Sequence, residues 1–185
     1  MTDALDIIRE DHANLTRLLD ALEAELDKFE RGETPDYDII QGVADYCIGY
    51  PDLYHHPIED LLLRRLRERD PHAAEAVGDL DREHERLNAG TRRFQEAVVH
   101  VLQDHTVSRE SFHELARDFV ARYRAHMRRE DEVFLPAAAK ALGPEDRAAA
   151  IAEAGPRADP LFDETEGARF QVLRERLLRW SREAT

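Results

Sequence analysis

Four segments of the chain carry apolar residues at alternating spacings of three and four, the pattern of a helix with one buried face. Similar series run through 5–29, 77–101 and 112–137, and a less regular one ends in Leu62 and Leu66. In the first segment the apolar residues are Leu5, Ile8, Leu15, Leu19, Leu22, Leu26 and Phe29. We therefore expect four helices whose apolar faces meet in one core.

Helix-breaking residues separate these segments. Glycine, proline and polar residues gather at 32–35, 70–71 and 104–108, and 143–144 ends the fourth segment. Short connections of this kind join antiparallel neighbours. The predicted fold class is therefore all-α, an up-down-up-down four-helix bundle over residues 1–142. Pro51 and Pro57 are expected to kink the second segment.

Residues 143–185 are predicted to form a C-terminal helical extension. A short helix is expected between 143–144 and 155–156, and a final helix carries Phe170, Leu173, Leu177 and Trp180 at the spacing of a buried face. We expect this extension to pack on the bundle. A dimer contact or a lid over a functional site is the alternative role.

Polar residues interrupt the apolar face of every segment. Counted from the connecting turns, at about 1.5 Å per residue, they lie at the same height to within about one helical turn. Burying such groups unpaired costs a few kcal/mol each, and no charged residue of the same faces is available to pair them. We therefore expect them to meet in one layer of the core. They are His12, His55, Glu59, His84, His126 and Glu130.

Four imidazoles and two carboxylates are more ligands than one ordinary metal site needs, and they suit two metal ions. This donor set favours iron, zinc, manganese or copper. The His-x-x-x-Glu spacing of 55–59 and 126–130 places both side chains of each pair on one helix face. The alternative is a metal-free cluster that is hydrogen-bonded or responds to pH. The roles of His56 and Tyr54 stay open. Either could be an extra ligand or could contact the ligands; otherwise His56 faces solvent and Tyr54 packs in the core.

Composition excludes several classes of function. The chain of 185 residues has 26 Lys and Arg against 40 Asp and Glu, a net charge of −14, so nucleic acid is not an expected partner. No apolar run approaches the roughly 20 residues that span a bilayer, and the charged N-terminus is unlike a signal peptide. The single cysteine, Cys47, excludes an intramolecular disulfide. We expect a cytoplasmic protein without a membrane partner.

The order of these residues resembles the hemerythrin-like, or HHE cation-binding, domain family over roughly residues 1–140. The resemblance implies a four-helix bundle with two non-heme iron ions, joined by an Fe–O–Fe unit or by carboxylates. It makes the four histidines of the layer terminal ligands and its two glutamates bridges. Oxygen-carrying members have a further histidine one turn before the third-helix ligand, where this chain has Leu80.

The missing histidine leaves an open position on one iron, unless His56 or Tyr54 fills it. An open position favours reaction with hydrogen peroxide, O2 or NO over reversible oxygen carriage. The resemblance therefore implies a catalase- or peroxidase-like diiron enzyme with a role in oxidative stress. The alternative is a non-catalytic module that binds, senses or stores O2, NO or iron.

Overall fold

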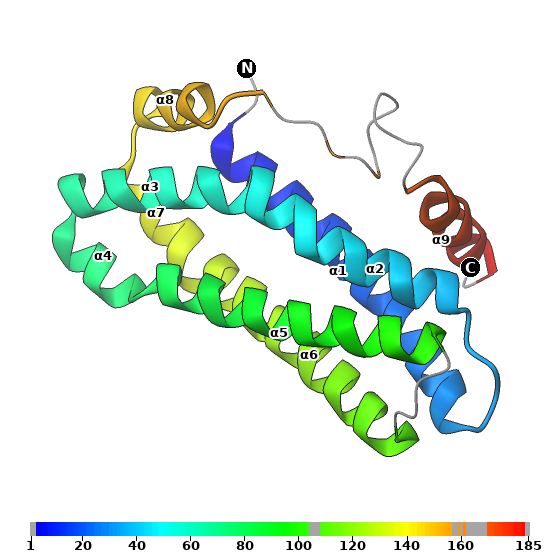
Figure 1. The fold of residues 1–185 in the computed structure, drawn as a ribbon. Coiled ribbons are helices and arrows are strands. Elements are labelled where there is room, and N and C mark those ends of the chain that lie inside the picture. Colours follow the sequence, from blue (N-terminus) through cyan, green and yellow to red (C-terminus); the bar gives the residue numbers. More distant parts are fainter. Residues whose placement is uncertain (1–2, 104–107, 157–158, 160, 162–169, 184–185) are drawn as a thin grey trace.

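The computed structural model describes residues 3–103, 108–156, 159, 161 and 170–183. Every regular element in these ranges is a helix (Figure 1). The all-α fold class predicted from the sequence is therefore confirmed. None of the described helices is long and apolar enough to cross a bilayer.

The chain forms four long helical segments and several short helices. In chain order they are α1 (Ala4–Glu30), α2 (Tyr37–Tyr50), η1 (Pro51–His55), α3 (His56–Arg69), α4 (Pro71–Val77), α5 (Leu80–Leu102), α6 (Arg109–Arg129), η2 (Glu130–Phe134), α7 (Leu135–Ala141), α8 (Pro144–Ala154) and α9 (Gln171–Glu183). The elements η1 and η2 are single π-helical turns, so α2–η1–α3 and α6–η2–α7 are each continuous. Together with α1 and α5 they are the four long segments.

The four long segments surround a common core. Helix α1 contacts α2 and α6, and α5 contacts the same two helices. Figure 1 shows consecutive segments running in opposite directions. The buried apolar side chains form two clusters, with Ile8 in one and Leu15 in the other along α1. His12 lies between these two residues, and the other segments divide in the same way.

Polar side chains fix where the helices begin. The side chain of the residue before α1, α2, α4, α5 and α6 accepts a hydrogen bond from a backbone N–H of the first turn, which satisfies a group that has no partner inside the helix. These capping residues are Asp3, Asp36, Asp70, Asp79 and Ser108. The connections predicted from the sequence therefore coincide with capped helix starts.

Each π-helical turn precedes a proline. A proline ring clashes with the carbonyl four residues earlier and provides no N–H. For Pro57 that carbonyl belongs to Leu53 in η1, and for Pro136 it belongs to Glu132 in η2. The wider turn accommodates the ring, and the His56 N–H bonds to the Pro51 carbonyl instead. The kink expected in the second segment is thus a π turn.

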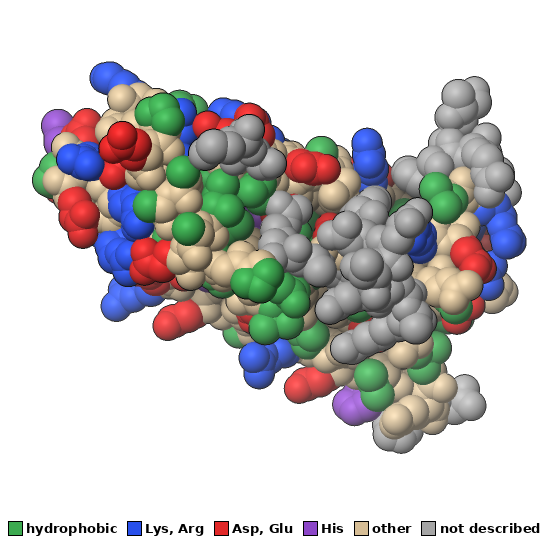
Figure 2. Space-filling model, turned by 90° about the horizontal axis from the view of Figure 1, so that it is seen from above, with side chains coloured by type: hydrophobic (Ala, Val, Ile, Leu, Met, Phe, Trp, Pro, Cys, Tyr) green, Lys and Arg blue, Asp and Glu red, His purple; other side chains and the backbone are tan. Residues whose placement is uncertain are grey.

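The C-terminal helices pack on the outside of the long segments. Helix α8 contacts α3 and α1, and α9 contacts α2 and α1. Figure 2 shows acidic, basic and hydrophobic side chains interspersed on the described part of the face that carries α8. Leu173 of α9 is 2 % exposed, and the side chain of Trp180 lies outside the described part of the chain. The boundary at residue 142 and a role in dimer contact or closure stay predictions.

Gly42 and Gly49 of α2 provide a test of how α9 is held. A Cβ at position 42 would lie 3.0 Å from the Leu173 Cβ, whereas one at position 49 would meet nothing within 4 Å. Gly49→Ala should raise the free energy of unfolding by about 0.5–1 kcal/mol through helix propensity. The free energy of unfolding of Gly42→Ala should be lower than that of Gly49→Ala by about 1 kcal/mol or more, because α9 must shift to make room for the Cβ. Denaturant unfolding measures both, and equal gains would contradict this packing.

Candidate metal centre

The six polar residues predicted from the sequence meet in one buried layer. Each of the six residues is at most 8 % exposed, and both glutamates are 0 % exposed. His12 comes from α1, His84 from α5, and the two His–Glu pairs span the ends of η1 and α6. The layer separates the two apolar clusters of the core.

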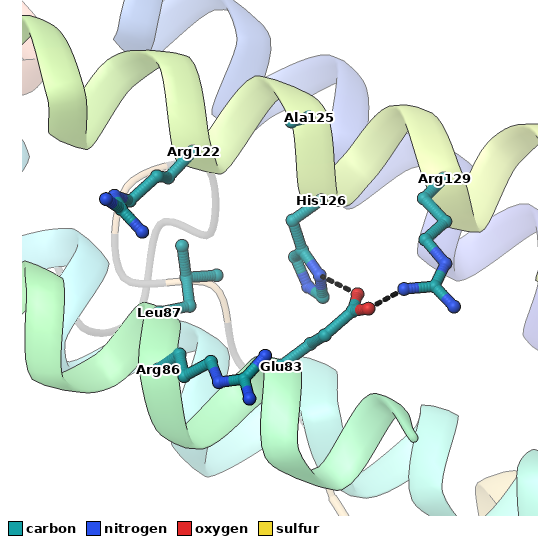
Figure 3. Close-up of a pocket in the computed structure, with 7 residues that line it drawn as sticks. All are labelled: Glu83, Arg86, Leu87, Arg122, Ala125, His126 and Arg129. Carbon is teal, nitrogen blue, oxygen red and sulfur yellow. Dashed lines mark ion pairs between the residues drawn. The ribbon is translucent and has the colours of Figure 1, made fainter. Parts of the chain in front are cut away.

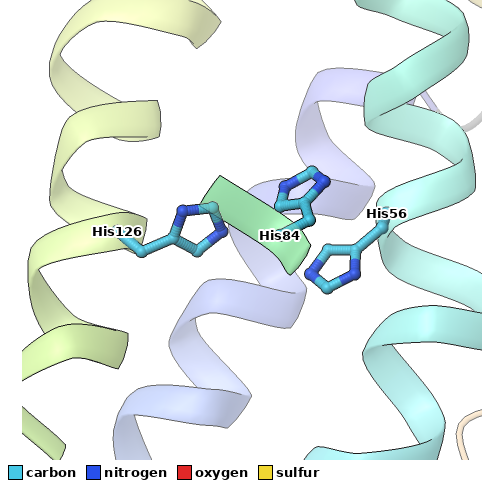
Figure 4. Close-up of side chains that lie close together, drawn as sticks. All are labelled: His56, His84 and His126. Carbon is cyan, nitrogen blue, oxygen red and sulfur yellow. The ribbon is translucent and has the colours of Figure 1, made fainter. Parts of the chain in front are cut away.

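The histidines and glutamates form two groups whose potential ligand atoms lie within 4.8 Å of one another. One group contains His12 and His55 with both glutamates. The other contains His56, His84 and His126, which come from α3, α5 and α6 in that order (Figure 4). The His56 ring stacks on that of His84 with 4.0 Å between centroids. His56, left open by the sequence, therefore lies inside the layer.

Both glutamates face the two groups at once. Glu130 Oε2 lies 3.2 Å from His12 Nε2, and its Oε1 lies 3.1 Å from His126 Nε2. Glu59 Oε1 lies 3.4 Å from His55 Nε2, and its Oε2 lies 3.5 Å from His84 Nε2. Each carboxylate thus has one oxygen toward each group, the arrangement required of a bridging ligand.

Tyr54 and Leu80 have no place in these groups. Tyr54 is partly buried, and its ring packs 5.6 Å from that of Tyr50, centroid to centroid. Leu80 is 1 % exposed and belongs to an apolar cluster. Of the two residues left open in the sequence, only His56 joins the layer.

A second set of carboxylates surrounds the histidines and contacts their outer nitrogens. Asp11 lies 3.1 Å from His55 Nδ1 and Asp131 lies 2.8 Å from His12 Nδ1. Because a carboxylate only accepts, these Nδ1 atoms donate, and the Nε2 atoms face the layer. The remaining pairs are Asp52–His56 at 3.0 Å, Asp60–His84 at 3.7 Å and Glu83–His126 at 3.7 Å.

Four of these contacts form a closed ring through the four long segments. Each long segment contributes the carboxylate that faces the histidine of the next segment: Asp11 to His55, Asp60 to His84, Glu83 to His126 and Asp131 to His12. The fifth, Asp52, lies four residues before His56 and also accepts from Asn88. The segments are therefore held in register through the layer.

The expectation that no charged residue would pair with the layer is wrong. Each carboxylate of the ring adjoins a layer residue in sequence, as Asp11 adjoins His12 and Asp60 adjoins Glu59. A step of one residue turns a helix by about 100°, which moves the side chain from the buried face to its edge, within reach of the neighbouring helix. The signal was an acidic residue next to a core histidine or glutamate in all four segments.

Burial and neighbouring charge move the pKa values of the histidines in opposite directions. Burial lowers the pKa of His56 and His126 to about 4 and also lowers that of His55. Burial acts in the same direction on His12 and His84, but contacts with Asp131, Asp60 and Glu130 outweigh it and raise both pKa values to about 9. Without a metal, two histidines are thus held as cations by the carboxylates.

The pKa values of the two glutamates also move in opposite directions. Burial and the charge of Glu130 raise the pKa of Glu59 well above its usual value. Burial acts on Glu130 too, but the neighbouring imidazoles of His12 and His84 lower its pKa below the usual value. Without a metal, the pKa values of the two carboxyl groups therefore lie on opposite sides of the usual value.

Several atoms of the layer have no hydrogen-bond partner among the described residues. They are His12 Nε2, both oxygens of Glu59, both ring nitrogens of His126 and Glu130 Oε2. Each such buried atom costs about 1–3 kcal/mol when left unpaired. Imidazole nitrogens and carboxylate oxygens are the donors that iron, manganese and zinc accept. The donor set and its unpaired atoms therefore fit a metal centre.

Fold and layer together define a helical metal-binding protein. The model of the hemerythrin HHE cation binding domain matches residues 3–138, and the chain belongs to this family. Comparison with curated proteins and with solved structures found no match. The resemblance seen in the sequence is therefore confirmed. The family implies metal binding, and the buried histidines and glutamates form clusters that could hold a metal.

Glu59 and Glu25 test whether the layer is incomplete without metal. Both are buried, but Glu25 accepts from Lys28 at 2.8 Å and from the Asp36 N–H at 2.7 Å, whereas Glu59 has no hydrogen bond. In metal-free protein, Glu59→Leu should raise the free energy of unfolding by about 1–3 kcal/mol, and Glu25→Leu should lower it by a similar amount. Chemical denaturation in chelator measures both. A loss of stability in Glu59→Leu would contradict the description.

Proposed function

We propose that the layer holds two non-heme iron ions bridged by Glu59 and Glu130. The observation that carries this proposal is that each glutamate has one oxygen toward each histidine group. His12 and His55 would be terminal ligands of one ion, and His56, His84 and His126 those of the other. The matching family, whose domain binds cations, supports the proposal.

We also infer that the four long segments form the up-down-up-down four-helix bundle expected from the sequence. The ring of carboxylate–histidine contacts requires each segment to lie beside the next, with the layer residues at one height. The bundle would cover residues 1–142, and α8 and α9 would be an extension packed against it.

The two ions would have different numbers of protein ligands. Counting one oxygen of each glutamate per ion, the His12 side has four donor atoms and the His56 side has five. His56 would thus take the place of the further histidine that oxygen-carrying members have at the position of Leu80. The open position would then lie on the ion of the His12 side. A small oxidant would bind there.

The supported activity is a reaction with hydrogen peroxide, O2 or NO, of a catalase- or peroxidase-like kind. Bound irons would supply the binding position and the electrons. The protein's own contribution is a water-poor layer between two apolar clusters, with imidazoles held in one tautomer by the outer carboxylates. A rigid layer of this kind keeps the donor atoms in place while a small molecule enters.

Binding without turnover is the second candidate. Each of the five outer carboxylates contacts a histidine, so none of these five groups is free to supply a proton to a bound oxidant. This observation favours a module that binds, senses or stores O2, NO or iron.

Peroxide turnover separates the two candidates. Iron-loaded protein should consume hydrogen peroxide faster than the same concentration of free iron, because the layer would hold an ion with an open position beside a second one. Release of O2 in half the amount of peroxide consumed would indicate a catalase-like reaction, and dependence on an added reductant a peroxidase-like one. Consumption no faster than that of free iron, together with a stable spectrum of the protein with NO, would favour the binding module.

His56 tests the assignment of ligands. His56→Ala should lose iron from the three-histidine side, reducing the iron content while His72→Ala retains all of it. His72 is a matched control because its side chain is 95 % exposed and lies far outside the layer. Metal analysis after dialysis checks both variants, with circular dichroism to show that each is folded. Equal iron content in the two variants would mean that His56 is not a ligand.

A further inference from the structure

A groove of about 300 Å³ lies between α5 and α6, on the outer side of the layer (Figure 3). Its walls are Glu83, Arg86, Leu87, Arg122, Ala125, His126 and Arg129. The volume is at the lower end of the range of small-molecule sites. The groove therefore has room for a small organic molecule.

The groove is basic, although the chain as a whole carries a net charge of −14. Three arginines and one glutamate line it. Arg129 pairs with Glu83 and donates to the Val77 carbonyl, so it serves mainly to fix Glu83. Among the described residues, Arg122 pairs only with Asp118, at 2.6 Å, and keeps further N–H groups for another partner.

Arg86 is the uncommitted charge of the groove. It is exposed and makes no hydrogen bond or ion pair with a described residue. Figure 3 shows Arg86 of α5 and Arg122 of α6 on either side of Leu87. Two guanidinium groups beside an apolar surface match a molecule with an anionic end and an apolar body.

His126 connects the groove to the layer. The residue is 8 % exposed, and neither ring nitrogen has a hydrogen-bond partner in the part of the chain that the structure describes. Its Nε2 lies 3.1 Å from Glu130 Oε1, and its Nδ1 lies 3.7 Å from Glu83 Oε2. A molecule in the groove would therefore lie against a residue of the metal centre.

We propose that this groove binds a small organic oxyanion, a carboxylate or a phosphate, through Arg86 and Arg122. Its apolar part lies on Leu87 and Ala125. As the place of an anionic co-substrate, the groove rests on the proposed function, because only a reacting metal centre gives such a co-substrate a purpose. Binding itself depends on the groove alone and is measured without turnover.

The test is calorimetry of the metal-loaded protein with benzoate and phenyl phosphate, with neutral benzamide as the ligand control. At least one of the two anions should bind saturably, and benzamide should not. Arg86→Ala should weaken binding about tenfold or more, as expected for the loss of a charged hydrogen bond. Arg128→Ala removes the same charge from an exposed position of α6 outside the groove, and it should leave the affinity unchanged within about twofold.

Three results would overturn the inference: no saturable binding of either anion, equal weakening by Arg86→Ala and Arg128→Ala, or binding that shifts the optical spectrum of the metal and ignores Arg86. The last would place the anion on the metal itself. Peroxide turnover without anion binding would remove this inference and leave the proposed function in place. Anion binding that needs Arg86 but occurs without turnover would support the groove and remove the proposed activity.

Discussion

The burial of seven titratable side chains in one layer is the constraint on which the rest of the structure depends. Charged groups are buried only where other polar groups replace the hydrogen bonds that they make with water. In this chain each long segment supplies a carboxylate to the histidine of the next, so these four contacts form together only when all four segments are in register. The apolar clusters on both sides stabilise the packing of the segments, while the ring selects one arrangement of them.

The two π turns lie where the layer needs them. An ordinary α-helix places consecutive residues about 100° apart, so two neighbouring histidines do not face one core together. The turn η1 ends at His55, and its wider path lets both His55 and His56 enter the layer. The turn η2 begins at Glu130 on the opposite segment. Each of the two prolines that would otherwise break these helices thus follows a π turn that carries residues of the layer.

Much of this could be predicted from the sequence, for a physical reason. Helical periodicity placed Leu15 and Leu22 in the core, and the same periodicity placed His12 and His84 among them. It could not place His56, because the number of residues per turn changes inside the π turn η1, and the spacing of apolar residues gives no sign of this change. It also missed Asp131 and Asp60, since side chains at the edge of a face meet their partners only once neighbouring helices are side by side.

A bridged pair of ions in the layer can be tested by titrating metal-free protein with ferrous iron under anaerobic conditions and measuring the amount of iron bound. We expect saturation at two equivalents per chain, because each glutamate has one oxygen toward each histidine group. Saturation at one equivalent would contradict the bridged pair. No tight binding at all would mean that the layer is a polar core stabilised by its own carboxylates.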